Sequence, residues 1–165
     1  MQLPQPLIDD LRTAELAGGD LFSADSAPAE IPASIPSGPG AYLLLIGLAR
    51  PVVLDMPRFS GVTVAPGWYA YAGNANGPGG LRARVARHLR QDKRAHWHVD
   101  LLTQAGTVAA LCFPASDECR LVGALTLTHT FSIPVPGFGS TDCRRCESHL
   151  VRWTKFEQSG LPGSQ

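Results

Sequence analysis

Three side chains that suit chemistry on a phosphate ester lie close together in the middle of the chain. Tyr71 lies in a short apolar segment, and Arg84 and His88 follow it after a stretch rich in glycine. A tyrosine or a histidine can take or relay a proton, and the planar guanidinium of arginine suits a bidentate contact with phosphate oxygens. These three residue types at one strand–helix junction indicate chemistry on phosphate more than packing.

A strand over residues 67–72, a loop over 74–80 and a helix over 81–90 are expected to position these side chains. Arg84 and His88 are four positions apart, so a helix places them on one face. The apolar stripe of the same helix is formed by Leu81, Val85 and Leu89.

The segments before this junction are typical of antiparallel strands. Residues 40–48 predict a buried strand, residues 50–54 its hairpin partner, and residues 62–64 a further strand. Helices follow later in the chain. This order predicts a small α+β (α/β) layered domain and argues against a doubly wound parallel sheet.

A second helix, predicted over residues 116–128, carries the candidate metal ligand. Ser116 or Asp117 can cap it, and Glu118 lies in its first turn, where the helix dipole favours a carboxylate. Cleavage of a phosphodiester requires a base, charge stabilisation at phosphorus and usually a hard cation on oxygen ligands. One glutamate can hold a Mg²⁺ ion that keeps most of its waters. Tyr42 adds a second tyrosine to this set. Each of these residues alone is more often structural, and only their combination favours a function.

Size and composition limit the class of protein. The chain has 165 residues, 44% of them hydrophobic and 17% charged, which is typical of one globular domain. The sequence contains no apolar run of the roughly 20 residues that a membrane span needs. Its beginning does not resemble a secretory signal, so we expect a cytoplasmic protein with no membrane partner.

The net charge of zero hides an uneven distribution. Residues 1–39 hold six acidic residues and one basic residue and predict a partly flexible arm, with a short helix over 5–17 and the remainder a linker or a loosely docked segment. Residues 80–98 hold six basic residues and one acidic residue, which is compatible with a phosphate-bearing partner. The candidate contacts to a nucleic-acid backbone are Arg82, Arg87, Arg90, Lys93 and Arg94. The alternative for these bases is a solvated helix face.

A second constellation could bind zinc. Cys143 and Cys146 form a C-x-x-C turn, which lets two thiolates reach one tetrahedral ion, and His149 with the distant Cys119 could complete four ligands for Zn²⁺. The alternative is a set of reduced structural thiols near a loop, since disulfides are rare in the cytoplasm.

A third constellation surrounds Trp97. In a strand, His96, His98 and Asp100 would share one face and could act as metal or phosphate ligands. The alternative is an edge strand with Trp97 buried and the polar residues outside. Because the basic helix ends just before this segment, we expect it near a substrate groove and assign it no role.

Several of these motifs together resemble a known superfamily. Gly40-Ala41-Tyr42, Tyr71-Ala72-Gly73, Leu81-x-x-Arg84-x-x-x-His88 and Glu118 look like the GIY-YIG nucleases. The chain resembles most closely the small Uri-type branch, the DUF123 proteins, which are sometimes fused to a base-excision endonuclease. The stretches that carry this closer resemblance are residues 67–75, 84–89, 96–100 and 137–143, within a similar region spanning residues 40–153.

The resemblance implies a role for each matching residue. Tyr42 and Tyr71 would line the active site, one of them acting as the general base or relaying to it. Arg84 would contact the scissile phosphate, and His88 would assist proton transfer or phosphate binding. Glu118 would hold a single Mg²⁺ or Mn²⁺ ion.

The resemblance also implies an architecture, with two departures from the superfamily pattern. It implies a central, mainly antiparallel three-stranded sheet flanked by helices. Ala41 and Ala72 replace the two isoleucines of the superfamily motifs. The wide spacing between Tyr42 and Tyr71 implies an inserted hairpin. The expected domains are an arm over 1–39, a nuclease-like domain over 40–155 and a tail over 156–165.

The expected function is therefore metal-dependent hydrolysis of phosphodiester bonds in DNA, with a DNA-repair enzyme as a candidate partner. Two alternatives remain open from the sequence. One is a non-catalytic nucleic-acid-binding or adaptor domain on the same scaffold. The other is a zinc-stabilised interaction module centred on residues 143–149.

Overall fold

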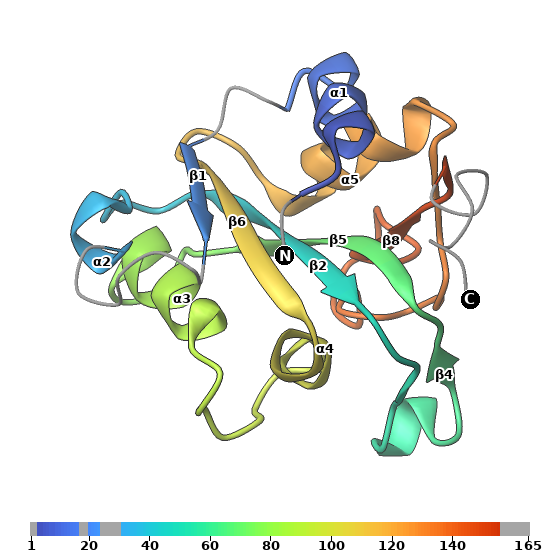
Figure 1. Cartoon of the computed structure of the whole chain (residues 1–165). Helices are drawn as coiled ribbons and strands as arrows, with labels where there is room; N and C mark the ends of the chain where they lie inside the picture. Colours follow the sequence, from blue (N-terminus) through green and yellow to red (C-terminus); the bar gives the residue numbers. More distant parts are fainter. Residues whose placement is uncertain (1–2, 17–19, 24–30, 156–165) are drawn as a thin grey trace, which may run out of the picture.

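A six-stranded antiparallel sheet runs through the middle of the molecule, with helices on both faces (Figure 1). The computed structural model describes residues 3–16, 20–23 and 31–155. Within them, the strands lie in the order β1-β6-β2-β5-β8-β7. Their bounds are β1 Asp20–Ser23, β2 Ala41–Leu48, β5 Gly67–Asn74, β6 Thr107–Phe113, β7 Phe131–Ser132 and β8 Leu150–Trp153.

Helices cover both faces of the sheet, and β2 is therefore buried along its whole length. Its side chains alternate between the two cores that lie on these faces. Leu44 faces α3 and α4, whereas Leu43 faces α1 and α5. The short helix α2 lies beside α3. No helix in the described residues is both long and apolar enough to cross a bilayer. The helices are α1 Gln5–Thr13, α2 Ile31–Ser34, α3 Gly80–Leu89, α4 Asp100–Ala105 and α5 Glu118–Leu127.

The predicted α+β class is confirmed, and the sheet is wider than the three strands expected. Strand β1 adds to β6 on one side, and β8 and β7 add to β5 on the other. The helices predicted around residues 5–17, 81–90 and 116–128 are present as α1, α3 and α5. Asp117 caps α5, since its side chain accepts a hydrogen bond from the Arg120 backbone N–H at 3.0 Å.

The predicted hairpin partner of β2 is wrong. β3 (Val52–Val53) pairs with β4 (Thr63–Val64) in a separate two-stranded sheet, and β5 takes the place beside β2. The apolar pattern of residues 50–54 indicates a strand but does not say which strand it pairs with. This β3–β4 unit, with a 3₁₀ turn at Pro57–Phe59, is the hairpin that the wide spacing between the two tyrosine motifs implies.

The predicted strand over residues 96–100 is also wrong, because these residues form a turn that leads into α4. The Asp100 carboxylate holds the turn by accepting hydrogen bonds from the backbone N–H groups of His96 and Trp97, at 2.8 and 2.9 Å. A side chain that reaches back to the backbone in this way competes with strand pairing.

Helix α1, within the region predicted as a short helix, packs on the sheet. Leu7 and Leu11 of α1 are buried in the core that α5 shares. Asp10 accepts hydrogen bonds from Trp153 Nε1 at 2.7 Å and from Lys155 Nζ at 2.8 Å, so α1 is tied to the end of β8. The tail expected over residues 156–165 lies outside the described residues, as do residues 1–2, 17–19 and 24–30 of the expected arm.

Candidate functional site

The five side chains predicted to act on phosphate line one cleft of about 560 Å³. The cleft lies at the end of the sheet where β2 begins and β5 ends. Side chains from helices on opposite faces of the sheet can therefore reach it. The contributing positions are Tyr42 on β2, Tyr71 on β5, Arg84 and His88 on α3, and Glu118 at the start of α5.

Strand register places both tyrosines on one face of the sheet. Tyr42 lies opposite Gly73, and Tyr71 lies opposite Leu44, so all four residues project toward the α3 side. Gly73 lets the Tyr42 ring lie flat on β5, because a Cβ there would collide with the ring and its hydroxyl. Gly139 does the same for Tyr71: its Cβ would lie 2.6 Å from Tyr71 Cε2, and its φ of +71° suits glycine.

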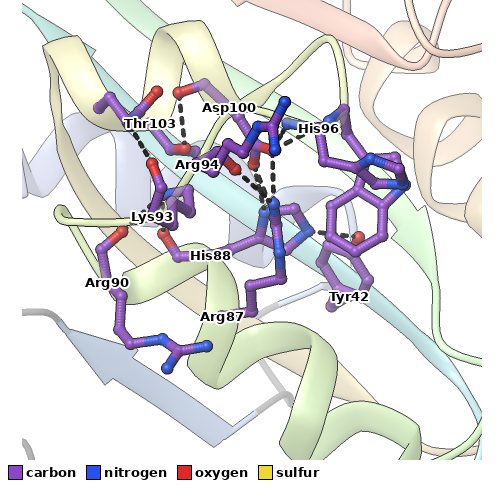
Figure 2. A network of polar contacts seen from close by, with 11 residues as sticks. Tyr42, Arg87, His88, Arg90, Lys93, Arg94, His96, Asp100 and Thr103 are labelled. Atoms are coloured by element: carbon purple, nitrogen blue, oxygen red, sulfur yellow. Dashed lines mark hydrogen bonds and ion pairs between the residues drawn. The ribbon is translucent and has the colours of Figure 1, made fainter.

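His88 lies at the centre of a buried polar chain (Figure 2). Its Nε2 atom is 2.9 Å from the Tyr42 hydroxyl oxygen. Its Nδ1 atom faces Asp100 Oδ1 at 3.6 Å, beyond hydrogen-bond distance, and makes no hydrogen bond. A proton on Nδ1 suits the facing carboxylate, so Nε2 then accepts the hydrogen bond from the Tyr42 O–H.

Asp100, the first residue of α4, lies at the end of this row of polar residues and is fully buried. Arg87 grips it with two hydrogen bonds, from Nη1 to Oδ1 at 3.0 Å and from Nη2 to Oδ2 at 2.9 Å (Figure 2). Burial alone would raise the pKa of Asp100, but His88, Arg87 and the two backbone N–H groups of the turn hold that pKa far below its usual range. Asp100 is therefore a carboxylate at every physiological pH.

Burial shifts the pKa of the other two members of the chain toward their neutral forms. It lowers the pKa of His88, and the nearby Asp100 offsets this only in part. It raises the pKa of Tyr42 well above its ordinary value, and that of Tyr71 to about 12 even though Arg84 lowers it. The resting site at neutral pH thus holds a neutral imidazole and two protonated tyrosines.

Arg84 lies beside the Tyr42–His88–Asp100 residues and stacks on Trp97. Its Cζ atom is 4.4 Å from the indole centroid, and the Arg87 Cζ atom is 4.1 Å from the same centroid. Arg87 is committed to Asp100, whereas Arg84 makes no ion pair in the described part of the chain. Its guanidinium is thus a cation in the cleft that can contact an anionic ligand.

Glu118 enters the cleft from the opposite side. Asn74, the last residue of β5, donates a hydrogen bond from Nδ2 to Glu118 Oε1 at 3.1 Å. The other carboxylate oxygen carries no hydrogen bond among the described residues. One fixed carboxylate with a free oxygen fits a hard cation that keeps most of its waters.

The four predicted zinc ligands also meet, and three of them, Cys119, Cys143 and His149, line the same cleft. One ligand atom each from Cys119, Cys143, Cys146 and His149 lies within 4.8 Å of all the others. Cys119 Sγ lies 3.3 Å from Cys143 Sγ and 4.0 Å from His149 Nε2. A Cys₃His set of this kind could bind a metal such as zinc.

A family model described as "Domain of unknown function DUF123" matches residues 41–160. The chain belongs to the DUF123 family. The match begins with β2 and includes β8, so it contains every residue of the cleft described above. No curated protein and no solved structure gives a significant match.

The basic residues predicted to contact nucleic acid divide into two groups in this DUF123 domain. Arg82, Arg87 and Lys93 have partners within the chain. Arg82 Nε donates to the Ile35 carbonyl at 3.0 Å, and the buried Lys93 ammonium donates to two carbonyls at the end of α3, at 2.6 and 3.0 Å. Arg90 and Arg94 are exposed and border a second hollow of about 670 Å³ beside the end of α3.

His96 and His98 both line the cleft from the turn before α4, although they do not lie on a strand. The His96 ring packs edge-on against Trp97, with centroids 5.2 Å apart. The His98 ring packs against Phe59 and Phe138, with centroids 5.6 and 5.9 Å apart. Both histidines therefore help to shape the wall of the cleft.

Two polar residues acquire a part in this DUF123 site that the sequence did not predict: Asn74, which lines the cleft, and Asp100, which is buried behind His88. The position of Asp100 beside His88 depends on the turn over residues 96–100, and tertiary contacts decide the geometry of that turn. An available indication was an acidic residue at the start of an apolar segment, which favours the first turn of a helix. For Asn74, at the edge of a glycine-rich loop, no sequence pattern distinguishes a role from ordinary turn chemistry.

Proposed function

We propose that this DUF123 domain is a metal-dependent endonuclease that hydrolyses phosphodiester bonds in DNA. The observation that carries the proposal is the convergence in one cleft of two tyrosines, a histidine, an arginine and a carboxylate, the last two with no ion pair to any residue that the structure describes. A proton acceptor, a phosphate contact and a hard-cation ligand are the groups that phosphodiester hydrolysis needs.

The Tyr42–His88–Asp100 chain supplies the base. A water that contacts the Tyr42 hydroxyl gives up its proton to that oxygen as the hydroxyl proton moves to His88 Nε2. The imidazolium that forms faces the Asp100 carboxylate, which orients the ring and stabilises the positive charge. Because the pKa of Tyr42 is raised, the two transfers are coupled and no free tyrosinate accumulates.

The remaining groups act on the phosphate. The water oxygen attacks phosphorus, the bond to the leaving oxygen breaks, and Arg84 stabilises the negative charge that develops on the phosphate oxygens. Tyr71 lies on the same side of the sheet and can give its hydroxyl proton to the leaving oxygen, which departs as an alcohol, and Tyr71 regains a proton from solvent. Glu118, held by Asn74, would bind Mg²⁺ or Mn²⁺, which supplies a Lewis acid for the same charge.

DNA rather than a small phosphate ester is the substrate that the surface around the cleft favours. Arg144 and Arg145 line the cleft and are exposed, although Arg145 also pairs with Asp117 at 3.0 Å, and Arg90 and Arg94 border the separate hollow at the end of α3. Exposed arginines at the cleft and at the neighbouring hollow suit the repeated charges of a nucleic-acid backbone.

The proposal is tested with purified full-length protein on supercoiled, single-stranded and branched DNA in the presence of Mg²⁺ or Mn²⁺. We expect cleavage that Tyr42→Phe and Glu118→Gln each reduce by roughly a hundredfold or more. The control is Glu147→Gln, an exposed glutamate outside the cleft, which should cut like the wild type.

Two outcomes would contradict the proposal. If no DNA is cut although the protein binds it, the non-catalytic nucleic-acid-binding alternative holds. If the protein neither cuts nor binds DNA, the alternative of a zinc-stabilised interaction module holds.

A further inference from the structure

The Cys₃His cluster brings together two separate segments of the chain, the start of α5 and the loop before β8. Cys119 lies in the first turn of α5, directly after Glu118. Cys143 and Cys146 lie in the loop before β8, and His149 lies immediately before that strand. Cys146 of this loop packs against the core that contains α5, and the exposed Arg145 pairs with Asp117 at the cap of α5 at 3.0 Å.

The spacing of the ligand atoms fits one tetrahedral ion. Thiolates bound to zinc at about 2.3 Å lie roughly 3.8 Å from one another. The four atoms here all lie within 4.8 Å, and the 3.3 Å between Cys119 Sγ and Cys143 Sγ is far longer than the bond of about 2.05 Å in a disulfide. All four cysteines of the chain are free thiols in the structure.

The backbone around Cys143 gives a second, independent indication of a ligand. The N–H groups of Arg145 and Cys146 both point at Cys143 Sγ, at 3.3 and 3.4 Å. Two backbone donors aimed at one sulfur stabilise a thiolate, which is the form that binds a metal.

His149 is fixed in advance for the same role. Its side chain is buried, and its Nε2 atom faces the sulfur atoms. Its backbone N–H donates to the Phe138 carbonyl, and its carbonyl accepts from the Ala72 N–H, both at 2.9 Å. The ligand is therefore held by the edge of the sheet, which gives the ion a rigid attachment.

We propose that Cys119, Cys143, Cys146 and His149 bind one structural Zn²⁺ ion that fastens the loop before β8 to α5. Three thiolates and one imidazole satisfy all four positions of a tetrahedral zinc ion, so no position is left open for substrate. The ion then fixes the neighbours of its ligands, Glu118 next to Cys119 and the arginines Arg144 and Arg145 between the two loop cysteines. This role differs from the proposed catalytic cation, because oxygen ligands suit Mg²⁺ and thiolates suit zinc.

Metal content and cobalt substitution test the proposal without any activity assay. We expect about one zinc ion per chain in full-length protein purified without chelator. Replacing zinc by Co²⁺ should give the intense visible bands of a tetrahedral site together with thiolate-to-cobalt charge transfer. Cys143→Ala should lose the ion, whereas Cys112→Ala, a buried thiol on β6 outside the cluster, should keep it.

If Cys143→Ala fails to fold, a second variant can still test whether the cluster binds a metal. Cys146→His replaces one sulfur ligand by an imidazole nitrogen and keeps four ligands, so it should bind Co²⁺ with a shifted spectrum and weaker charge transfer.

Three results would overturn the proposal: wild-type protein without zinc and with four titratable thiols, two thiols lost to a disulfide under non-reducing conditions, or an octahedral cobalt spectrum. A protein that holds zinc but cuts no DNA would keep this inference and reject the nuclease, so the two proposals fail separately.

Discussion

The two polar clusters beside the cleft differ in how their charges are balanced. Around His88, the protein itself supplies the partners: Asp100 receives two bonds from Arg87 and two from the backbone, and Tyr42 covers the other side of the ring. In the Cys₃His cluster, the ligand atoms mainly face one another. The charges of the first cluster are balanced by protein groups alone, although His88 Nδ1 makes no hydrogen bond with the described residues, and the second cluster requires a cation when its thiols ionise.

Because of this difference, the two clusters should be destabilised by different changes. The His88 cluster is sensitive to loss of a side chain, because every removal leaves a buried group without its partner. The Cys₃His cluster is sensitive to loss of the ion. The two should therefore respond differently to mutation, chelation and pH.

The largest effect on stability is expected for Asp100→Asn. The change leaves Arg87 without a counter-charge and turns one of the two acceptor oxygens into an NH₂ donor, so either Arg87 or the turn before α4 loses its acceptor. The free energy of unfolding should fall by about 3 kcal/mol or more. Urea denaturation measures this fall. Asp92→Asn, an exposed neighbour, is the control and should stay within about 0.5 kcal/mol of the wild type. A tolerated Asp100→Asn would show that the His88 cluster does not depend on this charge.

Removal of zinc should have the next largest effect. Zinc present at a hundredfold excess over its dissociation constant stabilises the folded state by about 2.7 kcal/mol, which corresponds to a melting temperature higher by roughly 5–10 °C. Differential scanning calorimetry with and without chelator measures the shift. Cys112→Ala should show the same shift as the wild type. An unchanged melting temperature would mean that the Cys₃His cluster, like the His88 cluster, needs no bound cation to balance its charges.

Acid should affect the His88 cluster in two steps. Burial lowers the pKa of His88, so below pH about 6.5 the imidazole is protonated in the unfolded state but stays neutral in the folded state. The free energy of unfolding therefore falls as the pH drops below that value. Because the pKa of Asp100 is also lowered, a further loss follows below about pH 4, where the unfolded carboxylate protonates. The first step should reach up to about 1 kcal/mol between pH 6.5 and 5.5.

Variants locate the first step. His88→Gln should remove it from a series of urea titrations, whereas His129→Asn, at an exposed position with a φ of +59° that asparagine accepts, should leave it in place. If both variants keep the step, another group is responsible for it.

The smallest effect on stability is expected for Arg84→Ala, which removes only a stacking contact with Trp97. The free energy of unfolding should change by less than about 1 kcal/mol, while DNA cleavage falls by roughly a hundredfold. Arg50→Ala, in the exposed turn after β2, is the matched control. A large loss of stability in Arg84→Ala would place this residue with the structural members of the His88 cluster.

Local patterns were sufficient to predict the parts of the cleft that depend on one element. The stripe of Leu81, Val85 and Leu89 fixes which face of α3 is buried, and helical spacing then places Arg84 and His88 next to each other. Asp117 is recognisable as a cap because its side chain acts on its own helix.

Features that depend on partners distant in the sequence could not be predicted in this way. Strand alternation suggested that His96, His98 and Asp100 share a face, but the Asp100 carboxylate turns the backbone back on itself. Nothing within residues 50–54 states that β3 pairs with β4, since that choice depends on where β5 enters the sheet. Likewise, β1 extends the sheet from a segment whose acidic composition gave no indication of burial against β6.

The stacking of two guanidinium groups on Trp97 gives the cleft an optical reporter. Of the three tryptophans in the chain, Trp68 and Trp153 are buried in the core on the far face of the sheet, whereas Trp97 lines the cleft. Arg87 is held in place by Asp100, so Arg84 is the partner of the indole that is free to move toward a bound anion. Occupation of the cleft by phosphate should therefore register as a change in the emission of a single indole, even with a substrate that is never cut.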